Sequence, residues 1–246
     1  MARQHHGRRV VAIVASAAVL FGCGEQRPPL AVAEPTGTTV AVAWPQLHET
    51  ADAVAPGVET VWLRRRSVTV HATPGGRRVT SVRSRTPYGS RTRLWVQERS
   101  GAWLKVAALD TSSGVGWIEE RRTKPARNVA RRVVIDRSAQ RLTVYGGART
   151  WSTRVVVGAA GTPTPLGSYQ VTDRLRGERF GGTYGAWVLA LSAFGTPART
   201  SRLAVHGIPP AARPGTGSAG CVRVPLRALR RLAREIVPGT PVRIRA

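Results

Sequence analysis

The chain has 246 residues, 42% of them hydrophobic and 6% aromatic, and a formal net charge of +25 that arginine carries almost alone. This length leaves room for two small cores. So large a charge favours polyanionic partners, but no recognition motif accompanies the arginines, and we therefore expect no nucleic-acid partner.

The first 23 residues have the plan of an export signal. Arg3, Arg8 and Arg9 precede an apolar run over residues 10–21, and Cys23 follows shortly after it. The run is shorter than the ~20 residues that a bilayer-crossing helix needs, so residues 1–23 are predicted to be a signal peptide. An exported chain meets an anionic cell envelope and not DNA. A solvated basic surface without a specific partner is the alternative for the arginines.

The end of this segment resembles a bacterial lipoprotein box, formed by Leu20, Gly22 and Cys23, with the less usual Phe21 between them. The resemblance implies lipidation of Cys23 and attachment to the outer face of the cytoplasmic membrane, next to the cell wall. The chain has only two cysteines. If Cys23 carries lipid, no second cysteine is left to form a disulfide with Cys221 in a compartment that tends to oxidise thiols.

Residues 24–56 are rich in Pro, Ala and Thr without sustained periodicity, which predicts a tether. Residues 57–123 then show short apolar segments separated by Gly turns, as expected for a small β-barrel. The stretches 100–106 and 116–118 loosely resemble the end of a bacterial SH3-like wall module. This region contains Trp62, Trp95, Trp103 and Trp117.

These four tryptophans are predicted to form core more readily than a ligand platform, because aromatic residues in a small β domain usually pack inside it. His71 lies in the same region without other metal ligands nearby in the sequence. We therefore interpret it as a structural or surface residue.

A second domain is predicted over residues 128–246, mostly of β structure. Alternating apolar residues over 132–136 and 141–145 predict two strands around a turn at 138–140, and 152–157 predicts another strand. A helix is predicted between Pro225 and Pro238-Gly239. Its apolar face is expected to contain Leu226, Leu229, Leu232, Ala233 and Ile236, with arginines outward.

The most informative stretch of this domain joins His206 to Cys221, fifteen residues later, with Gly217, Ser218, Ala219 and Gly220 before the cysteine. A cysteine attacks a carbonyl carbon as thiolate and needs a base close in space. Small neighbours allow backbone N–H groups to approach the oxyanion that forms. The loop before the predicted helix is also expected to lower the thiol pKa through the helix dipole. A buried structural Cys and a core His are the alternative.

These residues resemble the signature of the L,D-transpeptidases with a YkuD-type catalytic domain: His206-Gly207, a spacer, then Ser218-Ala219-Gly220-Cys221-Val222-Arg223. Segments 133–145, 158–173, 184–192 and 239–244 fit the same family, so the resemblance covers about the last 115 residues. It implies a β-sandwich catalytic domain with one short helix, behind the SH3-like barrel. Many members have a second histidine where this chain has Ala219, which leaves proton transfer to His206.

The resemblance also implies a mechanism and its site residues. His206 would take the thiol proton, and Cys221 would form a thioester with a peptidoglycan stem peptide, which an amine of another stem would resolve. Gly207 would orient the imidazole through its carbonyl, and the N–H groups of Gly220 and Cys221 would bind the oxyanion. Further expected site residues are Ser218 as a loop hydrogen-bonder, Arg223 as a carboxylate ligand or structural ion-pair partner, Tyr184 in the donor cleft, and Trp187, more readily core.

Two alternatives remain open from the sequence. Water could resolve the thioester, which would make the chain a cysteine carboxypeptidase or endopeptidase, or the chain could be a wall-binding lipoprotein without activity. Carbapenem-type β-lactams are expected as covalent inhibitors because they resemble the donor acyl group. No metal cluster, phosphate loop or cofactor fingerprint is found in the sequence, so neither metal nor cofactor is predicted.

Overall fold

The structure is a computed structural model that describes residues 57–107, 113–193, 203–208 and 217–246. The chain divides into two units, residues 1–39 and 40–246. The predicted signal peptide, Cys23 and the tether over 24–56 lie outside the described residues, which all belong to the second unit. No helix in the described ranges is long and apolar enough to cross a membrane.

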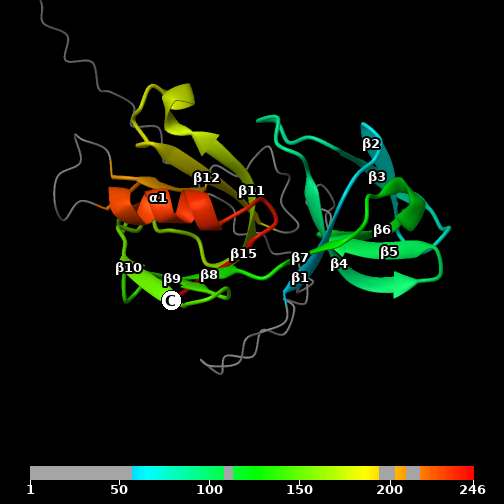
Figure 1. The fold of residues 1–246 in the computed structure, drawn as a ribbon, viewed down its shortest axis with the longest axis horizontal. Helices are drawn as coiled ribbons and strands as arrows, with labels where there is room; N and C mark the ends of the chain where they lie inside the picture. Colours follow the sequence, from blue (N-terminus) through cyan, green and yellow to red (C-terminus); the bar gives the residue numbers. More distant parts are fainter. Residues whose placement is uncertain (1–56, 108–112, 194–202, 209–216) are drawn as a thin grey trace, which may run out of the picture. The chain divides into compact units, whose positions relative to one another are not determined.

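The first part of this unit is a seven-stranded sheet with strand order β3-β2-β6-β5-β4-β1-β7, in which all neighbouring strands are antiparallel (Figure 1). A short 3₁₀ turn, η1 (Glu120–Arg122), precedes the last strand. The strands are β1 (Val58–Trp62), β2 (Ser67–His71), β3 (Arg78–Arg83), β4 (Arg93–Ser100), β5 (Trp103–Ala107), β6 (Val115–Glu119) and β7 (Arg127–Val129).

The core of the first sheet is aliphatic, and its tryptophans occupy several different environments. Trp95 and Trp117 are buried, at 1% and 8% exposure, as expected for core residues. Trp62 is half-buried, and the guanidinium groups of Arg93 and Arg127 lie 4.3 and 5.8 Å from its ring centroid. These cation–π contacts could not be predicted from the sequence, because the two arginines come from β4 and β7 while Trp62 lies in β1.

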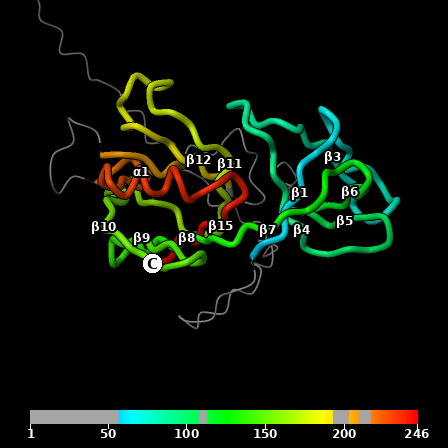
Figure 2. Tube along the Cα trace, viewed as in Figure 1, coloured from blue at the N-terminus to red at the C-terminus, as the bar shows by residue number. Residues whose placement is uncertain are grey.

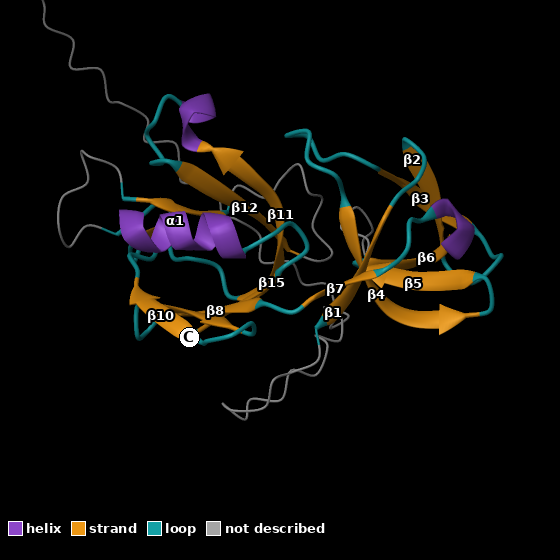
Figure 3. Ribbon diagram, viewed as in Figure 1, coloured by secondary structure: helices purple, strands orange, loops and turns teal. Residues whose placement is uncertain are grey.

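The second part is a mixed eight-stranded sheet with order β10-β9-β8-β15-β11-β12-β13-β14 (Figure 3). The C-terminal strand, β15, lies in its middle, between β8 and β11 (Figure 2), and it is parallel to β8 and antiparallel to β11. The strands are β8 (Arg132–Asp136), β9 (Arg141–Tyr145), β10 (Trp151–Arg154), β11 (Gly167–Arg176), β12 (Trp187–Ala193), β13 (Ala204–Gly207), β14 (Val222–Val224) and β15 (Pro241–Arg245).

The predicted hairpin of this sheet is confirmed, and its turn has a simple cause. The carboxylate of Asp136 accepts hydrogen bonds from Ser138 Oγ at 2.9 Å and from the backbone N–H of Ala139 at 2.8 Å. Gln140 completes the turn with a positive φ of 46°. An Asp side chain that bonds to the backbone two or three residues later favours such a turn.

The two edges of the eight-stranded sheet are joined through the segment that follows β10. Val156 and Arg223 exchange two backbone hydrogen bonds of 2.9 and 2.8 Å, and Ser218 N donates to Val157 O at 2.9 Å. The sheet therefore curls into a barrel-like arrangement around one core. This confirms the predicted mainly β fold with a single α-helix among the described residues.

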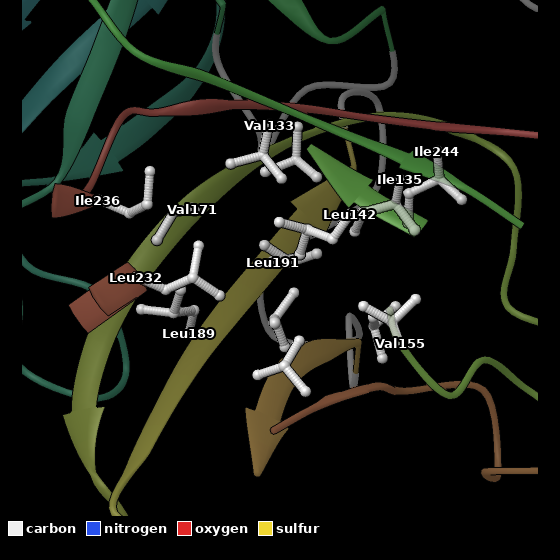
Figure 4. Packing of buried hydrophobic residues seen from close by; sticks show 14 of the residues in the cluster. Val133, Ile135, Leu142, Val155, Val171, Leu189, Leu191, Leu232, Ile236 and Ile244 are labelled. Carbon is white, nitrogen blue, oxygen red and sulfur yellow. The ribbon is translucent and has the colours of Figure 1, made fainter. Parts of the chain in front are cut away.

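The core of the second sheet packs against that helix, α1 (Leu226–Glu235). Figure 4 shows Leu232 and Ile236 packed beside Val171, Leu189 and Leu191 of the sheet. One expectation is wrong: Leu226 is 50% exposed. It occupies the first turn, one turn before Leu229, and the buried position there belongs to Ala228.

The two sheets also contact one another directly. Trp95 Nε1 donates to the carbonyl of Gly239 at 2.6 Å, and Gln170 Nε2 donates to the carbonyl of Arg93 at 3.2 Å. Gly239 has φ +93°, and a Cβ there would lie 2.3 Å from Cδ of Arg93. Buried polar bonds of this kind fix the register between two packed elements because each unpaired group would cost free energy.

Candidate active site

The pairing of β13 with β14 determines which side chains meet. The strands are parallel, with Val205 opposite Val222 and His206 opposite Arg223. Both valines are buried in the core. Because successive side chains of a strand point to opposite faces, His206 and Arg223 project from the other face of the sheet.

Cys221 immediately precedes β14, one register step before the Val205–Val222 pair. A backbone hydrogen bond from Ala204 favours its thiolate, and the charge of Arg223 acts on both Cys221 and His206. The structure thus brings together on one face the three side chains that the sequence singled out, Cys221, His206 and Arg223.

The imidazole of His206 is held in one tautomer. Its Nδ1 lies 2.7 Å from the carbonyl oxygen of Gly207. A carbonyl can only accept a hydrogen bond, so Nδ1 carries the proton and Nε2 keeps its lone pair. Burial lowers the pKa of His206, the Gly207 carbonyl opposes this, and the Arg223 charge lowers it further. The ring is therefore a neutral base at pH 7.

The thiol of Cys221 has the opposite shift from the one predicted. Burial raises its pKa, and the Ala204 hydrogen bond and the Arg223 charge only partly offset this. The expectation of a helix dipole at the thiol is wrong because β14 separates Cys221 from α1, which begins at Leu226. These directions of shift favour the neutral form of both the Cys221 thiol and the His206 imidazole at pH 7.

Hydrogen bonds within the cysteine loop define its shape. The Ser218 hydroxyl donates to the carbonyl of Cys221 and accepts the N–H of Gly220 at 3.1 Å. Ser218 is thus a loop hydrogen-bonder in this geometry, and Gly220 adopts φ +104°, which favours glycine. The predicted oxyanion role of the Gly220 N–H conflicts with this resting geometry, since that group already donates to Ser218.

Two threonines that the sequence analysis did not single out support this loop. The Thr164 hydroxyl is fully buried, accepts the N–H of Gly158 at 2.8 Å and donates to the carbonyl of Gly220 at 2.8 Å. Thr162 Oγ1 donates to the carbonyl of Ser218 at 2.9 Å. Both lie in the segment that resembled the family, but only the fold shows that their hydroxyls face the cysteine loop.

Tyr184 lies against the histidine. Its ring centroid is 4.8 Å from that of His206 at an interplanar angle of 85°, and its carbonyl accepts the N–H of Gly207 at 2.8 Å. A Cβ on Gly207 would lie 3.1 Å from this carbonyl oxygen, so glycine permits the close approach. Trp187 is half-buried on the core, and the Arg176 guanidinium lies 4.3 Å from its ring centroid.

Arg223 has an unusual environment. Its Nε is buried and has no hydrogen-bond partner among the described residues. Within that part of the chain no carboxylate forms a salt bridge with it either, which does not favour the alternative of a structural ion pair. A buried N–H group without an acceptor costs free energy, which a further acceptor at this position would recover.

The residues in the described ranges contain no group of His, Cys, Asp and Glu side chains suited to a metal ion. His71 instead bonds through Nδ1 to the carbonyl of Gly76 at 2.7 Å and packs edge-on against Trp103, with 5.0 Å between ring centroids. These contacts are those of a structural residue.

The sequence of the second part of the chain matches a model of a known protein family. Residues 130–244 match the family model described as the YkuD L,D-transpeptidase catalytic domain. The match covers the second sheet and its helix, and it shows that this part of the chain is similar to an L,D-transpeptidase catalytic domain of the YkuD type. None of the curated proteins matches the sequence.

Several solved structures resemble the chain distantly. A protein of Bdellovibrio bacteriovorus is 24% identical, with a TM-score of 0.39 over 47% of each chain. An L,D-transpeptidase of Stackebrandtia nassauensis is 19% identical, with a TM-score of 0.36 over 47% of this chain and 55% of that one. One of Mycobacterium tuberculosis is 18% identical, with a TM-score of 0.39 over 54% and 72%. The chain thus spans about half the length of the first two, and similarities this low carry no argument about activity.

Proposed function

We propose that the chain is a peptidoglycan L,D-transpeptidase that acts through a thioester on Cys221. The observation that carries the proposal is the His206 tautomer: Nδ1–H is held by the Gly207 carbonyl at 2.7 Å, which leaves Nε2 as a base on the sheet face that Cys221 shares. A neutral imidazole with a lowered pKa accepts a thiol proton when the sulfur attacks.

The proposed reaction has two halves. In the first, Nε2 of His206 takes the thiol proton, the sulfur bonds to a stem-peptide carbonyl carbon, and the tetrahedral oxyanion collapses to a thioester. The proton on His206 passes to the leaving amino group of a terminal D-amino acid. In the second half, an amine of another stem attacks the thioester, the carbon–sulfur bond breaks, and the thiol regains a proton.

Arg223 is proposed to bind a carboxylate of the donor stem. Its Nε is buried without a partner among the described residues, and a guanidinium pairs well with a carboxylate. Tyr184, 39% exposed beside His206, is proposed to line the donor cleft. The net charge of +25 supports association with an anionic envelope, and the first 23 residues support export and lipid attachment at Cys23.

The test is covalent labelling. The purified, reduced protein is incubated with a carbapenem, which resembles the donor acyl group, and its intact mass is measured beside Cys221→Ala and His206→Gln. One adduct is expected on the wild type, none on Cys221→Ala, and a much slower adduct on His206→Gln. A folded wild-type protein that forms no adduct would overturn the proposal.

A second measurement separates transfer from hydrolysis. With stem tetrapeptides as substrate, released D-amino acid is quantified against newly joined stems. Equal amounts are expected for a transpeptidase, release without joining identifies water as the acceptor, and neither product identifies a protein that only binds the wall.

A further inference from the structure

Aromatic contacts connect the first sheet to the histidine of the candidate active site. Tyr88, in the loop between β3 and β4, packs against Phe180 with 6.2 Å between ring centroids at 76°. Phe180 packs against Tyr184 at 5.7 Å and 89°, and Tyr184 against His206 at 4.8 Å and 85°. All three pairs are edge-to-face at favourable separations.

The loop that carries Tyr88 is held in place at both sides. Within the loop, Thr86 N donates to Ser90 O and Gly89 N donates to Thr86 O, both at 2.9 Å. Across to the second sheet, Thr86 Oγ1 donates at 2.5 Å to a carboxylate oxygen of Asp173, which is 1% exposed. The backbone on either side of Tyr88 is therefore held in a tight turn that is anchored to the second sheet.

The segment that carries Phe180 and Tyr184 is rich in glycine and is closed by backbone hydrogen bonds, from Gly177 N to Ala186 O at 3.0 Å and from Gly182 N to Gly177 O at 3.2 Å. It begins with the 3₁₀ turn η2 (Gly177–Phe180), and Gly181, Gly182 and Gly185 all have positive φ, between 65° and 76°. Glycines contribute no side-chain packing and lose much conformational entropy on folding. The loop of Tyr88 meets this segment twice, through the Phe180 ring and through Arg179, whose Nη1 donates to the Tyr88 carbonyl at 3.2 Å.

We propose that Tyr88 is a positioning residue of the active site: its ring, through Phe180, holds Tyr184 against His206. The proposal rests on the proposed function and extends it, because it assigns to the first sheet a part in catalysis. His206 is only 3% exposed, and the Tyr184 ring is one wall of its environment. When Tyr88 is removed, the glycine-rich segment moves, and the base occupies its productive orientation for a smaller fraction of the time.

The test is the second-order rate constant for carbapenem acylation of Cys221 in the full chain. Tyr88→Ala and Tyr88→Leu are each expected to be slower by roughly 2- to 10-fold, the range of one aromatic pair contact. Tyr88→Phe keeps the ring and is expected to react like the wild type. Val79→Ala is the matched control, because Val79 is an exposed β3 residue, at 41% against 44% for Tyr88.

A readout that mere stability would not move is the coupling between two sites. Tyr184→Ala should slow acylation, and adding Tyr88→Ala in that background should slow it no further, because both changes remove one contact path. As a control, the melting temperature of every variant is measured to establish that the variant is folded at the assay temperature.

Three results would overturn the inference: Tyr88→Ala as fast as Val79→Ala, Tyr88→Phe as slow as Tyr88→Ala, or independent effects of Tyr88→Ala and Tyr184→Ala that multiply. In each case a wild type that still forms its adduct leaves the proposed function intact. A wild type without any adduct would instead refute the proposed function, and this inference with it.

Discussion

Replacement of Thr164 by valine tests whether its hydroxyl holds the cysteine loop in place. The hydroxyl is 0% exposed and bonds at 2.8 Å both to the N–H of Gly158 and to the carbonyl of Gly220. Valine has nearly the same shape but satisfies neither group. A buried group left without a partner costs about 1–3 kcal/mol. Because one of the two groups is fully buried and the other partly buried, we expect the free energy of unfolding of Thr164→Val to be lower by about 2–4 kcal/mol.

Thermal unfolding followed by circular dichroism measures this loss. For a unit of this size, 1 kcal/mol corresponds to about 2–4 °C, so Thr164→Val should melt roughly 4–15 °C lower. Thr164→Ser retains the hydroxyl and should recover most of the difference. Thr143→Val, at a half-buried position of β9, is the matched control. Carbapenem acylation of Thr164→Val should also be slower, since Gly220 adjoins Cys221. Equal melting temperatures for Thr164→Val and Thr143→Val would refute the reasoning.

Three further predictions concern proton transfer, packing and metals. Burial lowers the pKa of His206 and raises that of Cys221. The acylation rate should therefore rise with pH below neutrality, as the imidazole loses its proton, and then stay level across pH 7–8. A tenfold rise in rate per pH unit between pH 7 and 8 would show that pre-formed thiolate reacts instead. Gly217→Ala should lower the melting temperature, because its Cβ would lie 2.5 Å from Ala159, with an overpacking cost of about 1–3 kcal/mol. Gly161→Ala, where nothing lies within 4 Å of the new Cβ, is the control, and an equal shift in both would contradict the packing argument. Acylation should be unchanged by a chelator; loss on chelation with recovery on added zinc would show a metal requirement.

The elements that the sequence predicted well are those set by local interactions. The hairpin of β8 and β9 follows from alternation and from the Asp136 turn, and α1 follows from apolar spacing between two prolines. Leu226 was wrongly predicted to be buried, because periodicity gives the direction in which a side chain points but does not show whether another element covers it. The position of β15 between β8 and β11 involves pairs of residues that are 71 to 109 positions apart, which no local pattern contains.

The candidate site divides in the same way. Cys221 and His206 could be selected from residue type and spacing, and Ser218 and Arg223 from the resemblance to a known family. The direction of the pKa shift of Cys221 could not be predicted from the sequence. The pKa is raised and not lowered because burial outweighs the Ala204 hydrogen bond and the Arg223 charge. Burial depends on the whole fold. Thr164 and Tyr88 were not selected at all, since a threonine or tyrosine in a loop gains its role only through distant partners.

The spacing of the motif is itself a consequence of topology. β13 and β14 are parallel neighbours. Parallel strands cannot be joined by a tight hairpin and need a connection of about a dozen residues or more. Residues 208–220 supply that connection, so the separation of fifteen residues from His206 to Cys221 is close to the shortest that allows both side chains on one sheet face. His206 and Cys221 are therefore distant in sequence because one lies in β13 and the other immediately before the adjacent parallel strand β14, and the small residues at 217–220 lie where the connection returns to the sheet.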